Sequence, residues 1–267
     1  NMTYNGIVDI TNEQYHSSDG FSKSALITYR NSPITFYKEY ILKQREHKTS
    51  DDMLLGNLVH TMILETSKVD ELYHFYNHIN RATKDGKAQA KELEEVELSG
   101  KILVKTEIAN QAVAMVEAIQ RNSIAMRIIV DAQVEKSVYW QDNDTCLTFK
   151  SRPDIISGNI VADLKTCKDV AYKAFQRSCM DYGYFLQASM CKLGLNAHDV
   201  DFERFVFICV DKATCEVVLY TLDEQAIEYG INQFKFLSTK ISNEIRDNSW
   251  LEPRIKVLEV PRWAEWE

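Results

Sequence analysis

The segment RPDIISGNIVADLKTC, residues 152–167, places two carboxylates and an ammonium group among mostly apolar residues. Asp163 and Lys165 are two positions apart, so in a strand their side chains lie on one face. The turn signal at 157–159 folds Asp154 back beside them on the neighbouring strand. Charges inside an apolar hairpin are costly unless they are paired or bind a metal. The segment therefore predicts a chemical site at one edge of a sheet.

A third carboxylate, Glu135, lies on the preceding predicted strand and can join the same face. Like charges this close do not all stay ionised without a cation, and hard oxygen ligands select Mg²⁺ or Mn²⁺. Lys165 could orient or help deprotonate a water beside such a metal, and the site would polarise a phosphodiester and supply a hydroxide. The alternative is that Asp163 and Lys165 form a solvent-facing strand pair and that Asp154 merely follows a proline turn.

Two helical segments could add side chains to this set. In GNLVH, Gly56 and His60 share one helical face, so that the helix can approach the sheet closely and His60 can serve as a further metal ligand. In YGYFLQ, Tyr184 and Gln187 also share a face and could contact a phosphate or hold Lys165. The alternatives are a structural histidine and ordinary helix packing.

Hydrophobic periodicity predicts the elements that must position these residues. We expect helices at 22–46 with a break at Ser32-Pro33, at 51–65, at 106–122, at 170–196 with an interruption near Gly183, and at 223–248 with Asp223 near the N-cap. We expect three consecutive antiparallel strands within 134–166 and two further strands at 203–212 and 216–222. Residues 81–101 are charged, and we expect them to be exposed and mobile.

This order of elements predicts an α/β fold, a mixed central β-sheet flanked by helices. We expect one domain over 1–267, with a helical part at 1–130 and a catalytic sheet core at 131–267. Six cysteines without a CxxC pair are interpreted as reduced core residues rather than a disulfide framework or zinc site. The net charge of −8 argues against a protein that coats nucleic acid by bulk electrostatics, but not against an enzyme with one basic channel. Without a signal peptide or an apolar run of ~20 residues, we expect a cytoplasmic protein and no membrane partner.

The ordered set GxxxH, Glu, PD, DxK and a following tyrosine and glutamine resembles the PD-(D/E)xK nuclease superfamily. Within it, the chain resembles the RecE-type (exonuclease VIII) nucleases, the phage and prophage partners of annealing proteins. The segments that carry the resemblance are SKSALITYRNSP, GNLVHTMILE, VEKSVYW, SRPDIIS, ADLKTC, YGYFLQASMC and VPRWAEWE. The C-terminal cysteine cluster of the iron–sulfur relatives and a P-loop are both missing from the sequence, so we expect neither membership of that branch nor an attached motor.

The resemblance implies a restriction-endonuclease-like core and a site with assigned roles. The implied metal ligands, for Mg²⁺ or Mn²⁺, are His60, Asp154, Asp163 and the Leu164 carbonyl. The implied catalytic residues are Lys165, which activates the water, Glu135, a ligand directly or through water, and Gln187 and Tyr184, which position the substrate or the lysine. The residues expected to grip a 5′ phosphate are Ser22, Lys23, Ser24 and Arg30. These four also fit an ordinary N-cap and solvated charges.

The resemblance also implies an activity and partners. Such enzymes degrade linear double-stranded DNA from the 5′ strand and leave a 3′ overhang for annealing-type recombination. The implied partners are double-stranded DNA ends, a RecT-like single-strand annealing protein and further copies of the chain in a trimeric or tetrameric ring, inside a bacterial or phage-infected cell. The alternatives are a single-strand-specific or endonucleolytic RecB-like nuclease and a non-catalytic DNA-end-binding protein.

Overall fold

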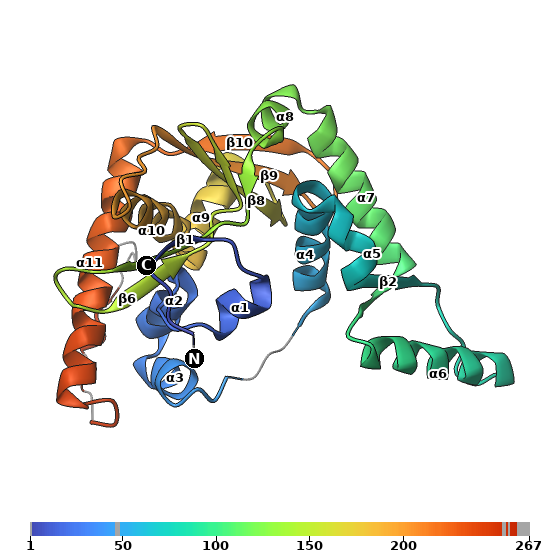
Figure 1. Ribbon diagram of the computed structural model, residues 1–267, viewed down its shortest axis with the longest axis horizontal. Helices are drawn as coiled ribbons and strands as arrows, with labels where there is room; N and C mark the ends of the chain where they lie inside the picture. The colour runs from blue at the N-terminus through green and yellow to red at the C-terminus, as the bar shows by residue number, and fades with distance from the viewer. Residues whose placement is uncertain (1, 46–48, 253–254, 256, 261–267) are drawn as a thin grey trace, which may run out of the picture.

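A five-stranded mixed β-sheet forms the centre of the molecule (Figure 1). The computed structural model describes residues 2–45, 49–252, 255 and 257–260. The strand order is β10 (Val217–Thr221), β9 (Arg204–Asp211), β8 (Ile160–Cys167), β7 (Ile155–Ser157) and β4 (Gln133–Val134). β8 and β9 are parallel, and all other neighbours are antiparallel. The two parallel strands are joined through two helices, which cover one face of the sheet.

Helices pack on both sides of this sheet (Figure 1). One side carries α2 (Lys23–Asn31), α9 (Tyr172–Tyr182), α10 (Tyr184–Asn196) and α11 (Glu224–Asp247), and the other carries α4 (Asp51–Leu64), α7 (Thr106–Arg121) and α8 (Ser123–Ile129). β8 alternates between the two cores, because Val161 packs with the first set of helices whereas Ala162 and Leu164 pack with the second. Over the described residues, no helix combines the length and apolar character that a bilayer crossing requires.

Two smaller sheets flank the centre. β1 (Gly6–Val8), β5 (Ser137–Gln141) and β6 (Thr148–Ser151) form a three-stranded sheet. β2 (Tyr73–Tyr76) and β3 (Ile102–Lys105) form a parallel pair, and α6 (Lys84–Leu98) lies between them in sequence. The remaining short elements are α1 (Asn12–Ser17), α3 (Pro33–Phe36), a π-helical turn (Tyr37–Ile41), a 3₁₀ turn (Thr66–Lys68) and α5 (Val69–Leu72).

Most predicted helices are confirmed. α4, α7 and α11 begin and end within about one residue of the expected bounds, and the Asp223 side chain caps α11 by accepting from the Ala226 N–H at 2.8 Å. The predicted break at Ser32 and the interruption at Gly183 are both present. The terminal motif VPRWAEWE lies outside the described residues after Val260.

Two predictions are wrong, and one is incomplete. The strands at 134–166 do not form one consecutive antiparallel set, because the chain leaves the central sheet after β4, forms β5 and β6 in a second sheet where β5 pairs with both β1 and β6, and returns at β7. Pro153 lies at that return and lacks the N–H that a continuous ladder needs. Residues 81–101 are mostly exposed, as expected, but the prediction lacked the regular helix at 84–98, which the Thr83 hydroxyl caps. Cys146 is an exposed turn residue rather than a core residue.

Candidate active site

The β7–β8 hairpin brings the two aspartates together. The pairing of Ile155 with Ala162 fixes the register, and one step further along it Asp154 faces Asp163. Both residues are buried, with exposed fractions of 9% and 3%. Carboxylates in such a position need cations close by, since the interior solvates charge poorly.

His60 supplies one of these cations from α4. Its Nε2 lies 3.0 Å from Asp154 Oδ2, and its Nδ1 lies 2.8 Å from the Gly56 carbonyl one turn earlier. The Leu164 N–H donates to the same Asp154 oxygen at 2.8 Å. Burial lowers the pKa of His60, but the charge and hydrogen bond of Asp154 outweigh it and raise that pKa to about 9. Both ring nitrogens therefore face an acceptor, the Asp154 carboxylate and the Gly56 carbonyl.

Lys165 supplies the second cation and takes part in a closed set of contacts. Its ammonium lies 2.7 Å from Asp163 Oδ2 and donates to Gln187 Oε1 at 3.0 Å. The Gln187 amide donates in turn to Asp163 Oδ1 at 2.6 Å. The Tyr184 ring covers the ammonium, with the centroid 4.3 Å away. Because Tyr184 and Gln187 lie in the first turn of α10, the start of this helix fixes the direction of Lys165.

The four charges perturb one another. Burial raises the pKa of Asp163, and the charge of Asp154 raises it further against the opposing effect of Lys165. For Asp154 the effect of burial is outweighed by His60, so its pKa is lowered. Burial lowers the pKa of Lys165, but Asp163 dominates and the net pKa is raised. Perturbed groups clustered in this way are typical of functional sites.

Glu135 lies beside this set but not on a strand. It connects β4 to β5 with a φ of 53°, and its N–H donates to the Asp154 carbonyl at 3.0 Å. Burial and the charge of Asp154 raise the pKa of Glu135 to about 7. Its carboxylate accepts from Arg152 Nε at 2.8 Å, and the same guanidinium donates to the Ile10 carbonyl at 3.1 Å. Arg152 was not predicted as a site residue, and its one signal in the sequence is its position two residues before Asp154.

Lys23, the first residue of α2, lies next to the candidate site. Its ammonium donates to the Tyr182 carbonyl at 3.2 Å and lies 5.6 Å from the centroid of the Tyr184 ring. Burial and the charge of Lys165 lower the pKa of Lys23 to about 8. Two lysines thus contact the same tyrosine ring.

The other residues expected to grip a phosphate are placed differently. Arg30 donates to the carbonyls of Met180 and Asp181, at 3.1 and 2.8 Å, near the end of α9. Ser22 is the N-cap residue of α2 without a side-chain cap bond, and Ser24 is exposed. In these contacts Arg30 holds a helix end, and its role as a phosphate ligand remains a prediction.

The carboxylate oxygens at the site suit a divalent metal ion. Asp163 Oδ2 is buried, and the contact found for it is the Lys165 ammonium at 2.7 Å. Carboxylate oxygens are the ligands that hard cations select. Among the residues that the structure describes, no three His, Cys, Asp or Glu side chains are already gathered as a metal site. A bound cation would therefore replace part of the positive charge that His60 and Lys165 supply.

Comparison with known proteins identifies a family for this chain and solved structures that it resembles. Residues 22–250 match the family described as a PDDEXK-like domain of unknown function (DUF3799). The solved structure named "Putative exonuclease" from Eubacterium rectale is 16% identical, with a TM-score of 0.64 over 95% of this chain and 96% of that chain. A phage-related exonuclease from Haemophilus somnus 129PT is 14% identical, with a TM-score of 0.35 over 86% of this chain and 96% of that one. No curated protein matches the chain. The predicted α/β fold with a mixed sheet flanked by helices is confirmed.

Proposed function

Because the chain belongs to the PDDEXK-like family DUF3799, which has a restriction-endonuclease-like fold, we propose that it is an exodeoxyribonuclease. Nucleases of this type generally use divalent metal ions. The proposed enzyme uses Mg²⁺ or Mn²⁺, degrades linear double-stranded DNA from the 5′ strand and leaves 3′ overhangs. The observation that carries the proposal is the closed set of contacts among Asp163, Lys165 and Gln187, beside the His60–Asp154 pair.

The first proposed role is metal binding. His60, Asp154, Asp163 and the Leu164 carbonyl would hold the cation. Such a cation polarises a phosphodiester and lowers the pKa of a bound water.

Lys165 is itself a cation held at a fixed position, so it can orient a water and stabilise negative charge that develops on the phosphate. Gln187 fixes the direction of the Lys165 side chain, because it accepts from the ammonium while it donates to Asp163. Arg152 neutralises Glu135, which limits the negative charge that incoming DNA would meet.

The test compares linear duplex DNA, labelled at either the 5′ or the 3′ end, with single strands and closed circles. We expect Mg²⁺-dependent release of nucleotides from the 5′ strand of linear duplex, intact circles, and no release in EDTA. Asp163→Asn should lower the rate by several orders of magnitude, because it removes both a metal ligand and the partner of Lys165. Asp144→Asn, an exposed carboxylate between β5 and β6, makes the same charge change away from the site and should retain full activity.

Each alternative has its own result. Cleavage of closed circles would make the protein an endonuclease, and digestion of single strands alone would make it RecB-like. Binding of DNA ends without hydrolysis would make it a non-catalytic end-binding protein. Full activity in EDTA would contradict the metal assignment. The threaded ring and the RecT-like annealing partner remain predictions, which processive digestion in the presence of competitor DNA and co-purification would test.

A further inference from the structure

The segment 73–105, comprising β2, α6 and β3 and here termed the arm, lies apart from the central sheet. Figure 1 shows α6 at the far end of the molecule from α11. The helix buries one stripe, Gly86, Ala90 and Leu93. In the described part of the chain, β2 and β3 pair only with each other, so both outer edges are open. Two-stranded sheets are marginally stable alone, and edges of this kind are commonly covered by another chain.

Charge on α6 is divided along its length. The first eight residues carry Lys84, Lys87 and Lys91 against one acid, Asp85. The last seven carry Glu92, Glu94, Glu95 and Glu97 and no base. This order opposes the helix macrodipole, which favours acids near the start and bases near the end. Among the ion pairs between described residues, none includes an α6 side chain. Helix stability therefore does not account for the pattern, and these charges are free to meet a partner.

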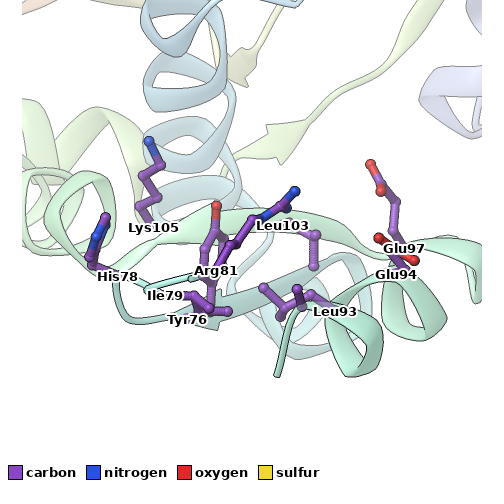
Figure 2. A pocket seen from close by; sticks show the side chains of 10 residues that line it. Tyr76, His78, Ile79, Arg81, Leu93, Glu94, Glu97, Leu103 and Lys105 are labelled. Atoms are coloured by element: carbon purple, nitrogen blue, oxygen red, sulfur yellow. The ribbon is translucent and has the colours of Figure 1, made fainter. Parts of the chain in front are cut away.

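A groove of about 260 Å³ between α6 and the strands is also lined by both basic and acidic side chains (Figure 2). Its basic side consists of His78, Arg81 and Lys105, and its acidic side consists of Glu94 and Glu97. Figure 2 shows His78 and Lys105 at one side of the groove, Glu94 and Glu97 at the other, and Arg81 between them. The apolar side chains of Leu93 and Leu103 line it between them. An occupant that satisfies this lining must itself carry both signs of charge beside an apolar surface.

We propose that the arm is the surface through which two copies of this chain associate, with the two α6 helices antiparallel across a two-fold axis, as an alternative to the three- or four-copy ring that the resemblance implies. A two-fold contact places the basic half of each helix against the acidic half of the other, and so satisfies both halves at once. DNA would suit the basic half alone and would be repelled by the four glutamates. Leu98 ends the acidic half with 88% of its surface exposed, and the same contact provides cover for it.

The test uses charge reversal in each half of α6. An acidic variant carries Lys84→Glu, Lys87→Glu and Lys91→Glu. A basic variant carries Glu94→Lys, Glu95→Lys and Glu97→Lys. Sedimentation velocity at low salt should give a dimer for the wild type and a monomer for each variant alone, since like charges then face each other. An equimolar mixture of the variants should form a heterodimer, because each half again meets its opposite.

Two controls separate this contact from general effects. A variant that combines all six substitutions reverses the whole pattern and should self-associate again, with an unchanged circular dichroism spectrum. Glu224→Lys with Glu228→Lys alters exposed charge on α11 and should leave the dimer intact. The proposal is overturned by a monomeric, trimeric or tetrameric wild type, by variants that stay dimeric alone, or by a mixture that stays monomeric. Loss of DNA binding in the acidic variant, with an unchanged mass, would assign the arm to DNA instead.

Discussion

Gly183 joins α9 to α10 and thereby sets the position of the first turn of α10, where the side chains that hold Lys165 begin. Its φ of 69° lies in the left-handed region. A Cβ added there would meet Ile27 Cδ1 and lie 2.9 Å from Ile27 Cγ1, on α2. The Gly183 carbonyl also accepts a hydrogen bond from the Gln187 N–H at 2.9 Å. We therefore expect Gly183→Ala to destabilise the fold and to displace Gln187.

The magnitude follows from two costs and one gain. Left-handed backbone costs a residue with a Cβ roughly 1–2 kcal/mol, and overpacking against Ile27 costs roughly 1–3 kcal/mol. Alanine also reduces the entropy of the unfolded chain, which returns about 0.4–1 kcal/mol. The net loss is about 3 kcal/mol. For a chain of this size that corresponds to a fall in Tm of roughly 6–12 °C in a circular dichroism melt.

Matched variants separate the two costs. Gly158→Ala has a similar φ of 56° but open space around the added Cβ, so it should show the backbone cost alone. Adding Ile27→Val to Gly183→Ala removes the atom nearest the new Cβ and should recover part of the overpacking cost. Equal losses for Gly183→Ala and Gly158→Ala, together with no recovery in the double variant, would refute the argument. The nuclease rate should fall with Gly183→Ala and remain unchanged with Gly158→Ala.

Three further predictions concern side chains in and near the site. Gln187→Met should lower kcat about 10- to 100-fold at a nearly constant KM, since it frees Lys165; a change in KM alone would contradict this role. His60→Ala should cost about 3–5 kcal/mol of unfolding free energy at pH 6, because it leaves Asp154 buried without its cation. The folded pKa of His60, about 9, exceeds the ordinary 6.5, so this loss should be full below pH 6.5 and should shrink as the pH rises through 9 in urea titrations. Burial lowers the pKa of Lys150 to about 8 from 10.5, so folding releases a proton between these values. Wild-type stability should rise relative to Lys150→Met across that window by at most ~1.4 kcal/mol per pH unit, and parallel pH profiles of the two proteins would disprove the assignment.

Local signals in the sequence predicted much of the frame. The apolar spacing at 106–122 and the cap residue Asp223 each specify a helix through neighbours in the chain, and both predictions are confirmed. Gly158 marks a turn, and the period of a strand then places Asp163 and Lys165 on one face. These inferences need only contacts between residues that are close in sequence.

Partners distant in sequence could not be predicted in the same way. Alternation shows which face a residue of β5 takes but not which strand it pairs with, so the departure of β5 and β6 to a second sheet was missed. Arg152 pairs with Glu135 across 17 positions, and nothing in the sequence indicates that contact. α6 was missed because its many charged residues resemble those of a solvated loop, although most of them are good helix formers.

β8 delivers consecutive residues to two hydrophobic cores, with Asp163 and Lys165 on the face opposite Leu164, whose backbone N–H holds Asp154 beside His60. All eight residues of this strand are paired in register with β9. Insertion or deletion of a single residue would exchange the faces and separate the charged side chains at the same moment as it disrupts both cores. The length of β8 therefore cannot change without loss of the site and of the packing on both faces. No such constraint applies to α6, whose residues belong to neither core, so a change of length there would leave the site in register.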